Sequence, residues 1–100
     1  MSTLFTLSTA WHDSVWLFEQ LCFAREGDAI LLLEDAVLAA HSPVSLASFM
    51  AKCSAMNIDV YVLQDDCEMR GINNKYEQLI AIDYARFVEL SVKHDKQVAW

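Results

Sequence analysis

The sequence is poor in glycine, proline and cysteine, with two, one and three of them in 100 residues. Gly27 and Gly71 are the only glycines, so no glycine-rich loop follows a predicted strand. Such a loop is what brings backbone N–H groups close to phosphates in nucleotide-binding α/β folds. We therefore exclude a mononucleotide or dinucleotide site of that kind and expect no cofactor.

The cysteines are few and widely spaced, at Cys22, Cys53 and Cys67. No CxxC pair and no Cys/His pair at zinc-like spacing occurs, so no metal site is predicted. An odd number of distant cysteines does not indicate a disulfide framework. Buried thiols are the default expectation for all three.

Basic residues and long apolar runs are also scarce. Seven Lys and Arg stand against 14 Asp and Glu, which gives a net charge of −7. This charge repels phosphate backbones and disfavours direct nucleic-acid binding. The longest apolar run, residues 29–33, is far below the roughly 18 residues that span a bilayer. The first residues lack the basic and apolar segments of a signal peptide, so we expect a cytoplasmic protein without a membrane segment.

What the sequence does contain is a large apolar fraction, 55%, arranged as alternating strands and helices of a single domain over residues 1–100. The predicted strands are residues 3–7, 29–34, 58–63, 79–82 and 97–100. The predicted helices are residues 14–25, 35–40, 43–56, 64–70 and 84–94. This alternation predicts βαβ crossovers and an α/β fold with a parallel sheet that helices cover on both faces.

Local signals mark where these elements begin and end. Gly27, Asn57 and Gly71 suit helix ends, since glycine and asparagine tolerate the left-handed conformation. Pro43 suits the first turn of a helix. Asp35, Asp65 and Asp83 are each expected to cap a helix amino terminus.

Polar residues follow the predicted strands: Ser8 and Thr9, Glu34 and Asp35, Gln64 to Asp66, and Asp83. In parallel sheets, chemistry gathers at the carboxyl ends of the strands. A functional site, if the chain has its own, is therefore expected at this edge. The carboxylates there would repel a nucleotide, and no catalytic pair or triad stands out among them.

Three stretches resemble the TusB/DsrH family of sulfur-relay proteins, and the TusB branch is the nearest likeness. The first is the tail IAIDYARFVELSVKHDKQVAW, with its Asp83-Tyr84 pair and closing Ala99-Trp100. The other two are EGDAILLLEDAV at 26–37 and VYVLQDDCEMRG at 60–71. The resemblance covers nearly the whole chain.

This resemblance implies a three-layer α/β/α domain with a mostly parallel five-stranded sheet, the DsrEFH-like fold. It implies assembly with TusC- and TusD-like sister subunits into a dimer of heterotrimers. Such a complex passes persulfide sulfur from a TusA-like donor to a TusE-like acceptor, for 2-thiolation of the wobble uridine in tRNA. In the related Dsr branch, similar complexes serve sulfur oxidation.

The resemblance does not carry a reactive cysteine over to this chain. In the TusD-like sister the cysteine lies at the end of the third strand, where this sequence has Leu63. Cys67 follows one helical turn later, flanked by carboxylates that disfavour a thiolate. Some DsrH-type relatives have a cysteine in the first helix, at the position of Gln20. Cys22 is two residues further and lies on the apolar stripe, so a core thiol is expected.

The tail supplies the candidate interface residues: Trp100, Val98, His94 and Lys93. A terminal indole indicates that this end is held, since chain ends otherwise fray. Either another subunit or the chain's own edge strand can hold it. His94, near the end of the last helix, also suits the helix dipole.

The sequence thus predicts a structural subunit of a TusBCD-like heterohexamer, with no catalytic activity of its own. One alternative is a subunit that itself carries persulfide on Cys67 or Cys22. Another is a stand-alone, homo-oligomeric domain that binds a small ligand.

Overall fold

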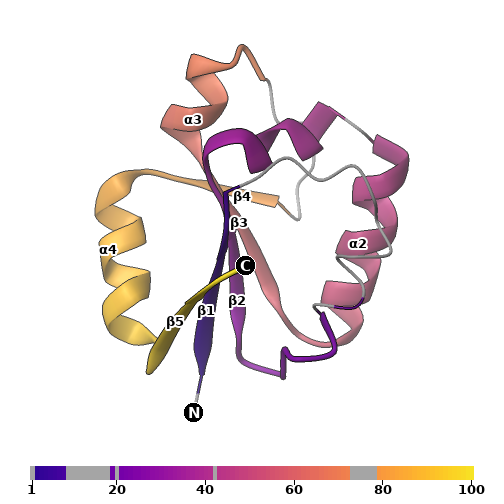
Figure 1. The fold of residues 1–100 in the computed structure, drawn as a ribbon, viewed down its shortest axis with the longest axis vertical. Coiled ribbons are helices and arrows are strands. Elements are labelled where there is room, and N and C mark those ends of the chain that lie inside the picture. Colours follow the sequence, from indigo (N-terminus) through magenta and orange to yellow (C-terminus); the bar gives the residue numbers. More distant parts are fainter. Residues whose placement is uncertain (1, 9–18, 20, 42, 73–78) are drawn as a thin grey trace.

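The computed structural model describes residues 2–8, 19, 21–41, 43–72 and 79–100, and within them it contains a five-stranded sheet (Figure 1). The strands are β1 (Thr3–Leu7), β2 (Ala29–Leu32), β3 (Asp59–Leu63), β4 (Leu79–Ile82) and β5 (Lys96–Ala99). Their order is β4-β3-β2-β1-β5, and each neighbouring pair is parallel. The predicted α/β fold with a parallel sheet is confirmed.

Helices cover the two faces of the sheet unequally. Helix α4 (Tyr84–Lys93) lies on one face. The 3-10 helix η1 (Glu34–His41) and helix α2 (Pro43–Ala55) lie on the other, and the short helix α3 (Gln64–Met69) follows β3 at the carboxyl edge (Figure 1). Half of the helix predicted over residues 14–25, namely 14–18 and 20, lies outside the described residues, and its predicted end is wrong because the helical conformation ends at Leu21. No helix in the described ranges is long and apolar enough to cross a membrane.

Two hydrophobic clusters sandwich the sheet. The larger packs one side of β1, β2 and β3 against α2 and η1, with Phe49 completely buried. The smaller packs the opposite side against α4, where Leu90 is completely buried. All four residues of β2 are buried, as expected for a strand that is covered on both faces.

Two of the three predicted helix ends are confirmed. Asn57 follows α2 and Gly71 follows α3, and both have positive φ, of 56° and 65°. Gly27 also has positive φ, of 90°, but the helical conformation before it already ends at Leu21, so the prediction that Gly27 ends this helix is wrong. Asp83 caps α4, because its Oδ1 accepts a hydrogen bond from the N–H of Arg86 at 2.9 Å. A side-chain oxygen there satisfies one of the donors that the first helical turn leaves unpaired.

Two predicted caps are wrong. Asp35 lies inside η1, which begins one residue earlier, at Glu34. Asp65 lies inside α3, whose cap position is Leu63 with no side-chain hydrogen bond. In both cases the helix begins almost directly after the strand, so the carboxylate that was expected before the helix falls within its first turn.

The carboxyl terminus is held by the chain's own sheet. Strand β5 pairs with β1 along its whole length, and the N–H of Trp100 donates to the carbonyl of Thr6 at 2.8 Å. The indole of Trp100 stacks on Phe5, with ring centroids 4.5 Å apart and an interplanar angle of 27°. The half-buried indole thereby fastens the edge strand to the larger cluster.

We expect Trp100→Ala to destabilise the fold, because it removes the stack on Phe5 and exposes the end of β1. A half-buried aromatic pair of this kind contributes about 1–3 kcal/mol to the free energy of unfolding. Urea denaturation followed by far-UV circular dichroism measures the change. Trp100→Phe, which keeps a ring in place, should retain most of the stability. Equal unfolding midpoints for Trp100→Ala and the wild type would contradict this role.

Candidate functional site

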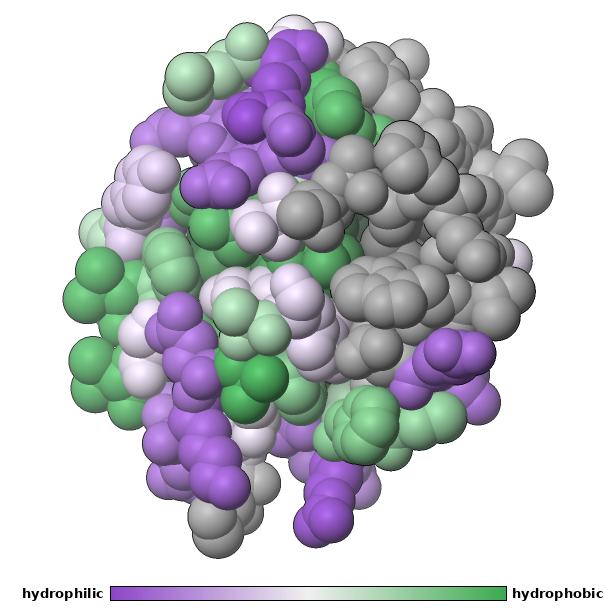
Figure 2. Space-filling view, in the orientation of Figure 1, coloured by the Kyte–Doolittle hydropathy of each residue, from purple (hydrophilic) through white to green (hydrophobic). Residues whose placement is uncertain are grey.

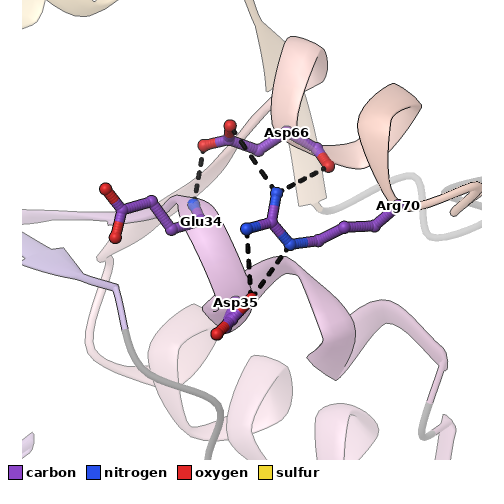
Figure 3. A network of polar contacts seen from close by, with 4 residues as sticks. All are labelled: Glu34, Asp35, Asp66 and Arg70. Atoms are coloured by element: carbon purple, nitrogen blue, oxygen red, sulfur yellow. Dashed lines mark hydrogen bonds and ion pairs between the residues drawn. The ribbon is translucent and has the colours of Figure 1, made fainter.

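The carboxyl edge of the sheet brings together Glu34, Asp35 and Asp66, three of the polar residues predicted to lie there (Figure 3). Asp66 is buried, and its Oδ2 accepts a hydrogen bond from the backbone N–H of Glu34 at 2.6 Å. Glu34 has a φ of 51°, a conformation that residues with a side chain rarely adopt. The short bond to Asp66 helps to hold the turn between β2 and η1 in this conformation.

Arg70 joins the carboxylates from the end of α3. Its Nε and Nη2 both lie 3.1 Å from Oδ1 of Asp35. Its Nη1 lies 3.4 Å from the carbonyl oxygen of Asp66 and 3.8 Å from Oδ1 of the same residue. The guanidinium therefore stands between η1 and α3 and neutralises part of their negative charge (Figure 3).

This network uses the carboxylates for structure. Asp66 is bonded to a backbone amide and to Arg70, Asp35 faces the same Arg70, and Asp83 serves as the cap of α4. General acid–base catalysis needs a carboxyl group that is positioned toward a substrate and has a matched pKa. Ser8 directly follows β1, and Thr9 lies outside the described residues.

Cys67 is the thiol nearest to this network, and it is buried, with 5% of its surface exposed. Burial raises the pKa of Cys67, and the neighbouring carboxylates of Asp66 and Glu68 raise it further, while Arg70 acts in the opposite direction. A sulfur carrier needs an accessible thiolate. The predicted effect of the flanking carboxylates is confirmed, and the environment of Cys67 opposes such a role.

The other two thiols differ sharply from each other. Cys53 is buried in the larger cluster as predicted, and burial raises its pKa to about 12. Cys22 is exposed, so the prediction of a core thiol there is wrong. The helical conformation ends at Leu21 and the chain turns at residues 22–23. The helical spacing that placed Cys22 on the apolar stripe therefore stops one residue before it.

The four interface candidates lie between the end of α4 and the residue that follows β5. Lys93 and Val98 are exposed, and Trp100 is half-buried on Phe5. His94 is buried, and its Nδ1 lies 2.9 Å from the carbonyl oxygen of Leu90, where it closes the end of α4. Contact of these residues with a partner stays a prediction.

Two features of the site were not predicted from the sequence. The link from Arg70 to Asp35 spans 35 residues and has no local signal. The link from Asp66 to Arg70 has one, because residues four apart are neighbours on a helix. From that spacing, an ion pair between Arg70 and Asp66 could have been predicted.

The opposite, amino edge of the sheet contains a hollow of about 370 Å³. It is lined by Met50, Ser54, Asn57, Ile58, Asp59, Val60 and Ile80. Neither Cys22 nor Cys67 is among these lining residues, and of the described residues that line the hollow only Asp59 is ionisable. Among the residues that the structure describes, no group of three or more His, Cys, Asp or Glu side chains is placed to hold a metal ion.

Comparisons with known proteins agree with the sequence and the fold. Residues 13–97 match the family model described as DsrH like protein. The chain is 39% identical over 93 residues to Protein TusB of Escherichia coli O81 (strain ED1a), which covers 89% of this chain and 95% of that protein. Protein TusB of Escherichia coli O6:K15:H31 (strain 536 / UPEC) matches equally well. The chain belongs to the DsrH family.

Within this family it is a TusB-like sulfur-relay protein, as its resemblance indicated. The fold agrees with a solved structure as well. The crystal structure of the ychN protein from E. coli superposes with a TM-score of 0.64, covering 99% of this chain and 97% of that one. At 14% identity this likeness concerns the fold alone, and it confirms the DsrEFH-like architecture.

In this DsrH-family chain, Asp66→Ala should lower the free energy of unfolding by about 1–3 kcal/mol, because it removes the acceptor of the partly buried N–H of Glu34 and one of the two carboxylates beside Arg70. Asp35→Ala is the matched control, since it removes a carboxylate that is 63% exposed. An exposed ion pair contributes less than about 1 kcal/mol. Chemical denaturation of the two variants measures both changes. Equal losses would show that the partly buried bond from Glu34 to Asp66 contributes no more than the exposed ion pair does.

The three thiols should react with an alkylating reagent in a fixed order. At pH 8, iodoacetamide should modify Cys22 first, because it is exposed, whereas Cys67 and Cys53 are buried and their pKa values are raised. Raising the pKa from 9.0 to about 12 lowers the thiolate fraction of Cys53 about a thousandfold. Peptide mass spectrometry after timed labelling measures the order. Labelling of Cys67 before Cys22 in the folded chain would contradict it.

Proposed function

We propose that this chain is a structural subunit of a TusBCD-like sulfur-transfer complex in the cytoplasm. Its partners are TusC- and TusD-like sister subunits, and the complex relays persulfide sulfur toward 2-thiolation of the wobble uridine in tRNA. The single observation that carries this proposal is the absence of an accessible thiol at the end of β3. Leu63, which is completely buried, stands where the TusD-like sister has its reactive cysteine.

The surroundings of that position support the same conclusion. A persulfide carrier has to attack or be attacked at sulfur, so its thiol must be reachable and easily ionised. Cys67 satisfies neither condition, because it is buried and its pKa is raised. In this chain the Asp66–Arg70–Asp35 network also occupies the carboxyl edge of the sheet. The equivalent edge of the TusD-like sister is the one at which its chemistry takes place in this proposal. The chain's contribution is therefore to complete the complex.

The relay reaction itself belongs to the other subunits in this proposal. A TusA-like donor presents a persulfide, the sister's cysteine accepts the terminal sulfur, and a TusE-like protein receives it next. The tRNA need not contact this chain, whose net charge of −7 repels phosphate. A structural subunit of this kind acts through the geometry of the complex, by holding its sisters in place.

A second candidate keeps sulfur on this chain, and the exposure of Cys22 is the observation that favours it. An exposed thiol can meet a persulfide donor without any rearrangement. We keep the structural subunit as the proposed function, because Leu63 occupies the position of the sister's reactive cysteine and the variants below test Cys22 directly.

Co-expression with the TusC- and TusD-like proteins of the same source tests the proposal. We expect the three chains to co-purify at constant stoichiometry, and sulfur transfer to a TusE-like acceptor to require this chain. The double variant Cys22→Ser, Cys67→Ala should support transfer at the wild-type rate, because neither thiol takes part. Radiolabelled sulfur on the acceptor measures the rate.

The controls separate the two candidates. A Cys→Ser change in the TusD-like sister should abolish transfer while the complex stays intact. If the double variant of this chain assembles normally but loses transfer, sulfur is carried here and the structural role is wrong. If this chain elutes as a monomer beside its sisters in size-exclusion chromatography, membership of the complex is wrong.

A further inference from the structure

Helix α3 stands apart from the body of the fold. It lies beyond the carboxyl edge of the sheet, beside η1 (Figure 1), and the surface in the upper left part of this view, where α3 lies, is mostly hydrophilic (Figure 2). Of its six residues only Asp66 and Cys67 are buried, and Met69 is 80% exposed. A helix of this length is not stable by itself in water. The stability of α3 therefore depends on the few groups that attach it to its surroundings.

Two polar contacts attach α3 to η1 (Figure 3). Asp66 accepts the hydrogen bond from the N–H of Glu34. Arg70, the residue after the helix, reaches Asp35 with both Nε and Nη2, and its Nη1 lies 3.8 Å from the carboxylate of Asp66. Cys67 adds an apolar contact, since its side chain belongs to the larger cluster. The attachment thus consists of one small buried side chain and a polar network with Arg70 at its centre.

The residues that flank this segment are fixed independently of it. Leu63 ends β3 and is completely buried, and Ile72 is buried in the larger cluster. Residues 64–71, which lie between them, belong to no strand of the described sheet. Gly71 has a φ of 65° and open space where a Cβ would stand, so the chain has conformational freedom at this end. Helix α3 can therefore move away from η1 without breaking a hydrogen bond of the sheet.

Movement of α3 would change the surroundings of Cys67. In the closed arrangement 5% of its surface is exposed, and burial and the carboxylate of Asp66 raise its pKa. With α3 detached, the thiol leaves the larger cluster and meets solvent. Cys53, on α2, is 1% exposed in the same cluster and becomes accessible only when the core itself opens. The two buried thiols therefore report on two different openings of the chain.

We propose that residues 64–71 form a latched segment, which detaches from η1 as a unit while the sheet stays folded, and which Arg70 holds closed over Cys67. Regions with few buried apolar contacts open locally at a lower free energy than global unfolding requires. The thiol of Cys67 is concealed in the closed state and accessible to thiol-directed electrophiles in the open one. This inference goes beyond the proposed function and does not rest on it, because it concerns the chain without partners.

The test follows labelling of Cys67 in the folded chain by iodoacetamide, whose iodide the thiolate displaces to form a thioether. Peptide mass spectrometry at timed intervals measures the rate. Arg70→Gln removes the guanidinium that holds the segment, and it should be labelled at Cys67 about tenfold faster than the wild type. Arg86→Gln is the matched control, because it also removes one positive charge and an ion pair, with Glu89 inside α4. It should be labelled at Cys67 at the wild-type rate.

Cys53 separates local opening from a change in global stability. In the wild type, Cys67 should be labelled at least about tenfold faster than Cys53. Low urea should speed the labelling of Cys53 alone, because global unfolding exposes far more surface than detachment of α3 does. Leu4→Val, which removes a methylene group from the smaller cluster, should likewise speed only Cys53.

Circular dichroism melting checks that each variant is folded at the labelling temperature. Should Arg70→Gln be unfolded there, Asp35→Asn tests the same contact from η1, with a smaller increase of up to about fivefold because Asp35 is exposed. If the folded variant is labelled at Cys67 no faster than the wild type, Arg70 is not the latch and this inference is wrong. If Cys67 and Cys53 are labelled at one rate with the same dependence on urea, global unfolding exposes both, and independent opening of α3 is wrong.

Discussion

Parallel pairing of strands that are buried on both faces is the constraint on which the rest of this structure depends. Strands β1, β2 and β3 lie inside the sheet, and a parallel connection between neighbours must cross over one face. Each crossover returns the chain to the amino edge, so the residues that follow β2 and β3 meet at the carboxyl edge. Glu34 and Asp66 are brought together in this way, although 32 residues separate them.

That meeting has an energetic consequence for the site. A turn directly after β2 leaves the N–H of Glu34 without a partner in the sheet, and even a partly buried donor without an acceptor is costly. Asp66 satisfies it, and Arg70 then balances the carboxylate. In an enzyme of this fold class the same edge would be left open for a substrate. Here Asp66, Arg70 and Asp35 occupy part of this edge with their own hydrogen bonds and ion pairs.

The sequence allowed much of the fold to be predicted, because its signals were local. The apolar run from Ala29 and the capping residue Asp83 sufficed to place a buried strand and a helix start. It did not allow the Arg70–Asp35 contact to be predicted, since a contact across 35 residues depends on how two crossovers pack. Cys22 was misplaced for a related reason: helical spacing predicts burial only while the helix continues, and it ends at Leu21.

The carboxyl edge of the sheet and the outer face of α4 both depart from what a self-contained enzyme would have. At the carboxyl edge, where related folds carry chemistry, Asp35 and Asp66 are paired with Arg70, and the nearby thiol of Cys67 is buried. On α4, where a monomer would place polar residues, valines face solvent. Exposed apolar area that does not serve the fold is costly to a free monomer, and burial against another chain recovers about 25 cal/mol for each Å². The paired polar groups of the carboxyl edge and the exposed apolar face of α4 both favour the proposed role of a structural subunit over that of a self-contained enzyme.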